Sequence, residues 1–146
     1  MIITFFGHKT ITSLDGLLEK IRQVIDYNIV PAEKTVFYCG GLGDFDNLCA
    51  KVCFGLKENN KNCEVLLITP YINVSKNNSK QYDGIRYPPL ENVPLKFAIS
   101  RRNMWMIDES DLVIVYVNHS FGGAYNAMKY AKRKKKRVIN LGTYKD

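Results

Sequence analysis

Short runs of branched and aromatic residues alternate along the chain with longer segments of helical periodicity, and this alternation constrains the fold more than any other feature. Parallel strands need a crossover of a dozen or more residues, usually a helix, between one strand and the next. The runs are almost continuously apolar, which is expected of strands that helices cover on both faces. We therefore predict an α/β fold, a three-layer Rossmann-like sandwich with a mostly parallel sheet of about five strands. The predicted strands are 2–6, 35–39, 63–70, 111–117 and 137–142, and the predicted helical segments are 13–29, 40–59, 94–110 and 122–134, with Ser13 as the first N-cap.

The 146 residues fit a single compact domain, 1–146, of ordinary composition, with 46% hydrophobic and 24% charged residues. No apolar run approaches the ~20 residues that a membrane-spanning helix needs. The first ten residues lack the basic start, long apolar centre and cleavage site of a signal peptide. We therefore expect a cytoplasmic protein without a membrane partner.

The four cysteines form no Cys-x-x-Cys pair, and a chain without a secretion signal should keep them reduced. Cys49 and Cys53 would share one helix face, so a metal site completed by His8 or His119 is an alternative. Buried thiols without a metal are common. We therefore expect neither a metal nor a cofactor.

The formal net charge is +7, and much of the excess lies in KYAKRKKKR, residues 129–137. Cations at the C-terminal end of a helix complement its dipole and keep that end solvated. A basic cluster can also bind a nucleic acid. Both interpretations are open from the sequence.

Glycines and polar residues follow four of the predicted strands, at the edge of the sheet where ligands of open α/β folds bind. They are GHK at 7–9, GGLGD at 40–44, TPY at 69–71 and NHSFGG at 118–123. Glycine lets the backbone approach a ligand closely, and the amides at a helix start attract phosphate. Neither glycine loop matches a Walker or GxGxxG motif, but together they predict a phosphorylated or nucleotide-like ligand.

Three segments, FYCGGLGDFDNLCAKV, ISRRNMWMIDESDLVIVYV and SFGGAYNAMKYA, follow in this order after a first strand that ends in FFGHK. In these segments the chain resembles the SLOG superfamily, which includes the Lonely Guy phosphoribohydrolases, the DNA-processing protein DprA and small stand-alone bacterial proteins of the YpsA and YoqJ type. YDGIRYPPLENVP and SRRNMWM resemble the stand-alone group most. The resemblance implies the fold predicted above and a nucleotide or nucleotide-derived ligand, such as an ADP-ribose-like molecule, in a bacterial or phage protein.

The chain departs from the Lonely Guy enzymes at one loop. Those enzymes carry PGGxGTxxE, whereas this chain has FGGAYNAMK, which keeps both glycines but has Met128 or Lys129 where the glutamate is expected. Cleavage of an N-ribosidic bond passes through a positively charged transition state that a carboxylate stabilises. Asp44 and Asp46 are the candidate substitutes, as general base or ribose acceptor, and a helix N-cap is the alternative role for Asp44.

The arginine pair before the fourth long strand resembles an Arg-Lys pair of the Lonely Guy enzymes. Arg101 or Arg102 could pair with phosphate. The structural alternative is a surface arginine in an ion pair with Asp108 or Glu109. Because of the resemblance to the Lonely Guy enzymes, we predict that Arg101 or Arg102 binds the ligand.

Other residues also have a ligand role and a structural alternative. His8 could polarise a ligand group or serve packing, and Asn118 would suit a ribose or phosphate contact. The interval 71–94 is long enough for a lid that stacks a tyrosine on a base, or else for packing on the sheet edge or a second copy. The predicted ligand-binding residues are Gly7, His8, Gly40, Gly41, Gly43, Asp44, Tyr71, Arg101, Arg102, Asn103, Asn118, Gly122, Gly123 and Ala124.

Three functions fit these observations. The first is binding of a small nucleotide or nucleotide derivative, as a sensor or sequestering module. The second is N-glycosidic hydrolysis of nucleoside monophosphates, against which the missing glutamate argues. The third is single-stranded DNA binding as in DprA, against which the lack of interleaved aromatic residues in the basic run argues. A homo-oligomer is a further alternative for partners.

Overall fold

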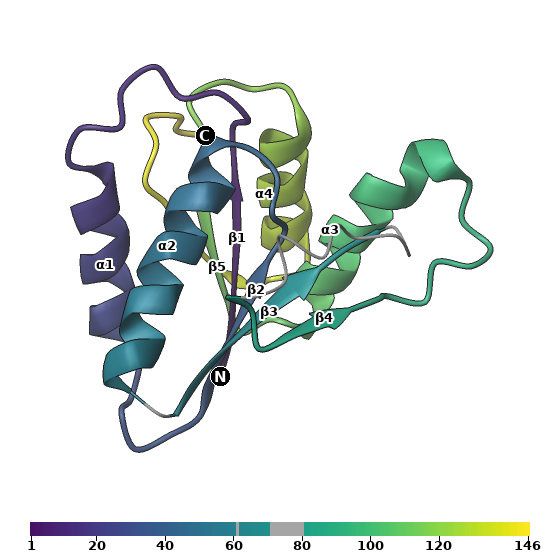
Figure 1. Ribbon diagram of the computed structural model, residues 1–146. Coiled ribbons are helices and arrows are strands. Elements are labelled where there is room, and N and C mark those ends of the chain that lie inside the picture. Colours follow the sequence, from purple (N-terminus) through teal and green to yellow (C-terminus); the bar gives the residue numbers. More distant parts are fainter. Residues whose placement is uncertain (61, 71–80) are drawn as a thin grey trace.

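A parallel sheet forms the centre of the computed structural model, which describes residues 1–60, 62–70 and 81–146 (Figure 1). All neighbouring strands within this described part pair in parallel. The predicted α/β, Rossmann-like class is therefore confirmed. In spatial order the strands are β4 (Gly84–Arg86), β3 (Cys63–Ile68), β2 (Thr35–Cys39), β1 (Ile2–Gly7), β5 (Leu112–Tyr116) and β6 (Arg137–Asn140).

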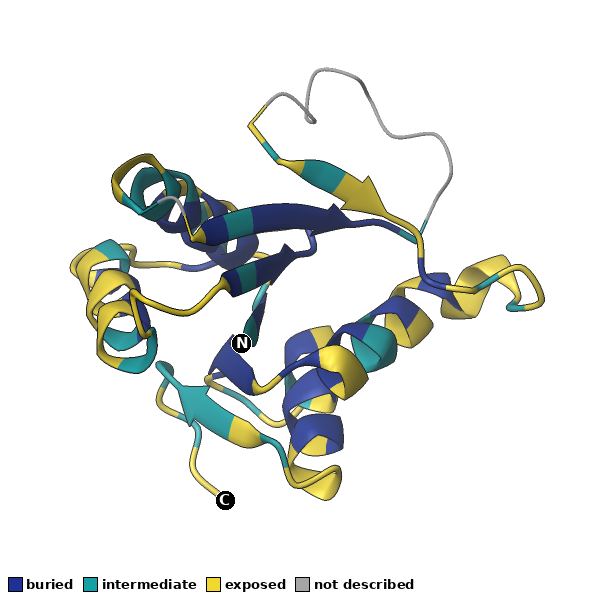
Figure 2. Cartoon of the chain, turned by 90° about the horizontal axis from the view of Figure 1, so that it is seen from below, coloured by how far each residue is buried: buried dark blue, intermediate teal, exposed yellow. Residues whose placement is uncertain are grey.

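Helices cover both faces of the sheet (Figure 2). Helices α1 (Leu17–Asn28) and α2 (Asp44–Asn59) pack on one face, and α3 (Ala98–Glu109) and α4 (Gly123–Arg133) pack on the other. A short 3-10 turn, η2 (Leu95–Phe97), leads into α3. Side chains of a strand alternate between the two faces, so Ile3 and Phe5 of β1 join the core under α1 and α2, whereas Phe6 joins the core under α3 and α4.

The strand order reverses at β1. From β1 the chain builds outward to β4 and then crosses back to β5, which pairs with the other side of β1. In open α/β sheets, ligands bind beyond the carboxyl ends of the strands at such a switch point. The fold therefore directs attention to the residues that follow β1, β2 and β5.

The sheet has six strands among the described residues, one more than predicted. The additional strand, β4, has three residues and lies within the interval 71–94, for which we predicted a lid or packing on the sheet edge or a second copy. A three-residue strand is too short to give a readable alternation of side chains. In the same interval the Tyr82 ring packs edge-on against Phe54, with ring centroids 5.0 Å apart, so this tyrosine packs onto α2.

Two predicted helix caps are wrong. Helix α1 begins at Leu17 after an N-cap at Gly16, whose φ of 73° interrupts the helical stripe, so Ser13 lies outside the helix. The N-cap of α2 is Gly43 rather than Asp44, because the Asp44 carboxylate accepts a hydrogen bond from the distant Ile11 N–H (2.9 Å) instead of an amide of its own helix. Among the described residues, no helix has the length and apolar character to cross a membrane.

Candidate functional site

The carboxyl ends of β1 and β5 are held together by hydrogen bonds. The His8 N–H donates to the Tyr116 carbonyl (3.3 Å), and the Asn118 N–H donates to His8 Nε2 (2.8 Å). The side-chain oxygen of Asn118 accepts from the N–H and the hydroxyl of Thr143, at 2.8 and 3.0 Å. The structure thus brings His8 and Asn118 together at the predicted edge and gives both a structural partner.

Another segment of the chain packs against the glycine loop at 40–44. The Asp44 N–H donates to the Lys9 carbonyl (2.8 Å). A Cβ on Gly43 would lie 2.9 Å from Lys9 Cα, so the two backbones are in contact. The start of α2 is therefore covered by the β1–α1 connection, and the ligand role that we predicted for this loop stays a prediction.

Arg102 lies buried beneath the same loop, with 4% of its surface exposed. Its Nη1 donates to the carbonyls of Gly40 (3.0 Å), which directly follows β2, and of Ile68 (3.3 Å), the last residue of β3. Its Nε and Nη2 donate to the side-chain oxygen of Asn103. Arg102 is thus not the surface arginine of the structural alternative, since its guanidinium connects the ends of two strands.

Asp46 is buried on the first turn of α2 and accepts a hydrogen bond from the Leu42 N–H (3.2 Å). Burial raises the pKa of Asp46 to about 7, although the Leu42 hydrogen bond and the Arg102 guanidinium act in the opposite direction. Both candidate carboxylates, Asp44 and Asp46, therefore already accept a hydrogen bond from a backbone N–H of the protein.

The second glycine loop, at the start of α4, is open. Gly122 is the N-cap, with φ of 92°, and its carbonyl accepts the first helical hydrogen bond, from Asn126 N–H. The N–H groups of Gly123 and Ala124 precede that bond, and helix geometry leaves such groups without an intrahelical acceptor. A Cβ on Gly122 or Gly123 would meet no atom within 4 Å. This helix start is therefore uncrowded at both glycines, and the free amide donors of a helix start attract anions.

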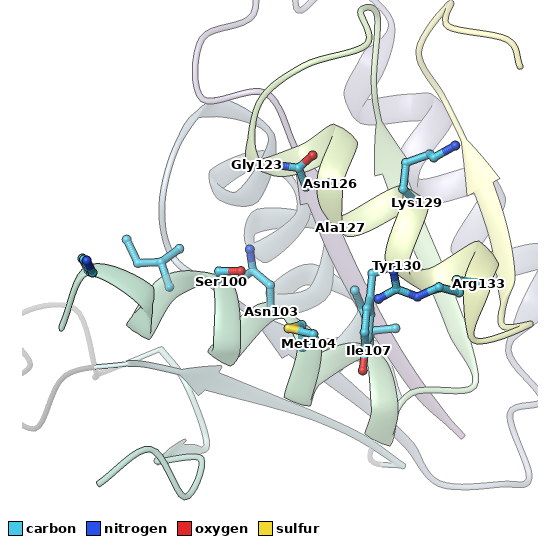
Figure 3. Close-up of a pocket in the computed structure, with 12 residues that line it drawn as sticks. Ser100, Asn103, Met104, Ile107, Gly123, Asn126, Ala127, Lys129, Tyr130 and Arg133 are labelled. Carbon is cyan, nitrogen blue, oxygen red and sulfur yellow. The ribbon is translucent and has the colours of Figure 1, made fainter. Parts of the chain in front are cut away.

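A groove between α3 and α4 opens beside this helix start (Figure 3). Its volume is about 510 Å³, within the range of small-molecule sites. Three cationic side chains, several amide or hydroxyl groups and several apolar side chains line it, and no carboxylate is among the lining residues of the described chain. The lining residues are Lys96, Ile99, Ser100, Asn103, Met104, Ile107, Gly123, Asn126, Ala127, Lys129, Tyr130 and Arg133.

The groove contains two predicted ligand residues, Asn103 and Gly123. Met128 is fully buried in the core, whereas Lys129 lines the groove. Of these two residues, only Lys129 is therefore placed to contact a ligand in the groove. Sequence reasoning missed the other polar lining residues, Lys96, Ser100, Asn126, Tyr130 and Arg133, although their spacing of three or four along each helix marks one face.

A stack of three rings lies on the loop that leads to α4. The ring centroids of His8 and His119 are 3.8 Å apart, as are those of His119 and Phe121, and the planes are tilted by 14° and 17°. Burial, and secondarily the neighbouring His119, lowers the pKa of His8 below its ordinary value. The lowered pKa favours the neutral ring, consistent with the hydrogen bond that His8 Nε2 accepts from the Asn118 N–H.

The remaining predicted ligand residues lie in different surroundings. Gly7 is close to Phe45, since a Cβ there would lie 2.3 Å from the Phe45 side chain, and Ala124 is buried at the start of α4. Arg101 is exposed on α3. Tyr71 lies outside the described residues. All four cysteines are buried and free, and the described residues contain no cluster of three metal-ligating side chains.

Comparison with known proteins shows a likeness in fold. Neither a scan of family models nor a search of curated proteins found a match. A DNA processing protein A from Helicobacter pylori, described for its single-stranded DNA binding mode, matches with a TM-score of 0.67 at 17% identity, over 99% of this chain and 66% of its own. DprA from Streptococcus pneumoniae matches with a TM-score of 0.65 at 16% identity, over 94% of this chain and 49% of its own. The chain shares its fold with DprA proteins.

A third solved structure, the protein TM1055, matches with a TM-score of 0.61 at 13% identity, over 94% of this chain and 71% of its own. This chain spans about two thirds of the first DprA structure and half of the second. The DprA matches agree, at the level of the fold, with the SLOG resemblance. The stand-alone YpsA and YoqJ branch stays a prediction.

Proposed function

We propose that this protein binds a nucleotide or nucleotide-derived ligand in the groove between α3 and α4, as a sensor or sequestering module. One observation carries the proposal. The same groove is lined by the uncrowded helix start at Gly123 and by three cationic side chains, Lys96, Lys129 and Arg133. Amides at a helix start and nearby cations together favour a phosphate group.

The remaining side chains of the groove fit the sugar of such a ligand. Met104, Ile107 and Ala127 offer apolar surface, and Asn103 and Asn126 offer amide groups that can bind ribose hydroxyls. The volume accommodates a mononucleotide or an ADP-ribose-like molecule. We propose that the ligand's phosphate lies at the Gly123 end of the groove.

The charge of the groove favours binding over hydrolysis. Cleavage of an N-ribosidic bond benefits from a carboxylate near the developing positive charge. The described lining residues include no carboxylate, and Lys129 would oppose that charge. The groove is thus suited to hold an anionic ligand intact.

Single-stranded DNA binding is the second candidate. Its support is the likeness in fold to a DprA protein described for its single-stranded DNA binding mode. Arg133, which lines the groove, is also followed in the chain by the exposed basic residues 134 and 135. A single strand could place one nucleotide in the groove and further phosphates along these cations.

The test is native mass spectrometry with calorimetry on a panel of nucleoside monophosphates, NAD, ADP-ribose, cyclic ADP-ribose and a thymidine oligonucleotide. Lys129→Glu is compared with Lys51→Glu, an exposed position on α2 with the same change of charge. We expect intact ligand on the wild type and on Lys51→Glu. Binding to Lys129→Glu should be at least tenfold weaker, because a hydrogen bond to a charged group contributes about 1.5–3 kcal/mol.

Other outcomes separate the alternatives. Released base with turnover would establish a hydrolase. Retention of the oligonucleotide alone, with a steep dependence on salt that charge reversal at residues 134–136 abolishes, would favour the DNA-binding candidate. Equal binding by Lys129→Glu and Lys51→Glu would exclude the groove as the site.

A further inference from the structure

Phe121 presents a large aromatic surface to solvent directly before α4. Its exposed fraction is 67%, which is high for a phenylalanine. One face of its ring lies against His119, which in turn lies against His8. Phe121 is therefore the outer ring of a stack, and its other face is available for a further flat group.

The inner rings are held in place by hydrogen bonds. His8 Nε2 accepts from the Asn118 N–H at 2.8 Å. His119 Nδ1 lies 3.0 Å from the Phe121 carbonyl, and because a carbonyl only accepts, Nδ1 carries the proton. The support beneath Phe121 is thus preorganised, which lowers the entropy that a ligand would lose by ordering it.

The exposed ring and the open helix start are neighbours in the chain. Phe121 precedes the N-cap Gly122, and the two steps from Phe121 to Gly123 span at most about 7 Å. The base and the 5′-phosphate of one nucleotide cover a span of this size. An aromatic platform beside an anion-binding helix start matches the two recognition elements of a nucleotide.

We propose that the free face of Phe121 stacks on the nucleobase of a ligand whose phosphate binds the start of α4. This inference rests on the proposed function and deepens it, because it makes the ligand a base-bearing nucleotide rather than a sugar phosphate. Stacking on a phenyl ring tolerates any base, since every base has a π-face. The platform therefore selects for the presence of a base and not for its identity.

The experiment is calorimetric titration of AMP, ADP-ribose and ribose 5-phosphate into the wild type, Phe121→Ala and Phe121→Trp. Tyr27→Ala, at an 88% exposed tyrosine on α1, is the matched control. Phe121→Ala should weaken AMP and ADP-ribose roughly tenfold, from the usual contribution of base stacking, and leave ribose 5-phosphate unchanged. Phe121→Trp keeps an aromatic ring and should bind AMP about as tightly as the wild type. Tyr27→Ala should bind all three probes as the wild type does.

Two results would overturn the inference while leaving the proposed function in place. One is wild-type affinity of Phe121→Ala for AMP and ADP-ribose, and the other is equal weakening of all three probes. A wild type that binds none of the probes overturns the proposed function for these ligands, and this inference with it.

Discussion

Gly43 and Gly122 adopt the same backbone conformation, with φ and ψ of 95° and 173° at Gly43 and of 92° and 175° at Gly122. Each is the N-cap of a helix that follows a parallel strand, and this region of φ and ψ accepts essentially only glycine. The surroundings differ, because the Lys9 backbone covers Gly43 whereas Gly122 faces open space. One local structure thus gives a closed helix start at α2 and an open one at α4.

Alanine substitutions should separate backbone strain from crowding at these positions. Gly122→Ala should cost about 1–3 kcal/mol of unfolding free energy through strain alone. Gly43→Ala should cost more, because its Cβ would also have to displace Lys9 Cα. Gly123→Ala is the control, since this helical position is uncrowded and alanine is favoured over glycine in a helix by up to ~1 kcal/mol. Urea unfolding measures all three, and a Gly43→Ala no less stable than Gly122→Ala would contradict the closed start.

The spacing of apolar residues along the chain is sufficient to predict the fold and the placement of glycines at the carboxyl edge of the sheet. Continuous apolar runs and helical stripes depend on residues near one another in sequence, so the strands and helices were readable. Whether a glycine loop is open or closed depends on contacts between distant segments. The Gly43 loop is closed by a contact with the backbone of Lys9, some thirty residues earlier in the chain. The sequence GGLGD alone does not predict that contact.

The groove was only partly predictable for a similar reason. Ser100 and Asn103 on α3, like Asn126 and Lys129 on α4, have the spacing of a single helix face. Which faces oppose each other depends on how the two helices pack. Arg102 lies beside Arg101 in sequence, yet it is buried and Arg101 is exposed, because successive helical positions point about 100° apart.

Ionisation of Asp46 should lower the stability of the protein as the pH rises. Its folded-state pKa of about 7 lies above the unfolded value of about 3.9, so the folded state binds more protons between these two pH values. The unfolding free energy should therefore fall between about pH 4 and pH 7, by up to about 1.4 kcal/mol per pH unit. Asp46→Asn, which cannot ionise, should gain stability relative to the wild type over this window.

Urea unfolding at pH 5 and pH 8 checks this prediction. The control is Asp26→Asn, which makes the same chemical change at an exposed carboxylate on α1. A difference between Asp46→Asn and the wild type that does not change with pH would show that Asp46 ionises in the folded state as it does in the unfolded chain.

Protonation of His8 should destabilise the protein in acid. Burial and His119 lower the folded-state pKa of His8 below 6.5, so the unfolded state binds more protons in this range. The contribution of His8 is complete above about pH 6.5 and is lost as the pH falls through the lowered pKa. His8→Phe keeps a stacked ring but cannot ionise, so its deficit in melting temperature relative to the wild type should shrink from pH 7 to pH 5. A deficit that is constant or grows in acid would contradict the lowered pKa.

Gly123→Asp should weaken binding without lowering stability. A carboxylate in the first turn of α4 complements the helix dipole by about 0.3–1 kcal/mol, and the Cβ of residue 123 meets no neighbour, so the melting temperature should be unchanged or higher. The same carboxylate would lie where we place the ligand's phosphate. Two like charges about 4 Å apart repel by about 4 kcal/mol at an effective dielectric constant of ~20, so AMP binding should weaken at least tenfold. Gly123→Ala, which adds the Cβ without the charge, should bind AMP within a few-fold of the wild type. Calorimetry on both variants measures these affinities. If a folded Gly123→Asp variant bound AMP as tightly as the wild type, the start of α4 would not be part of the binding site.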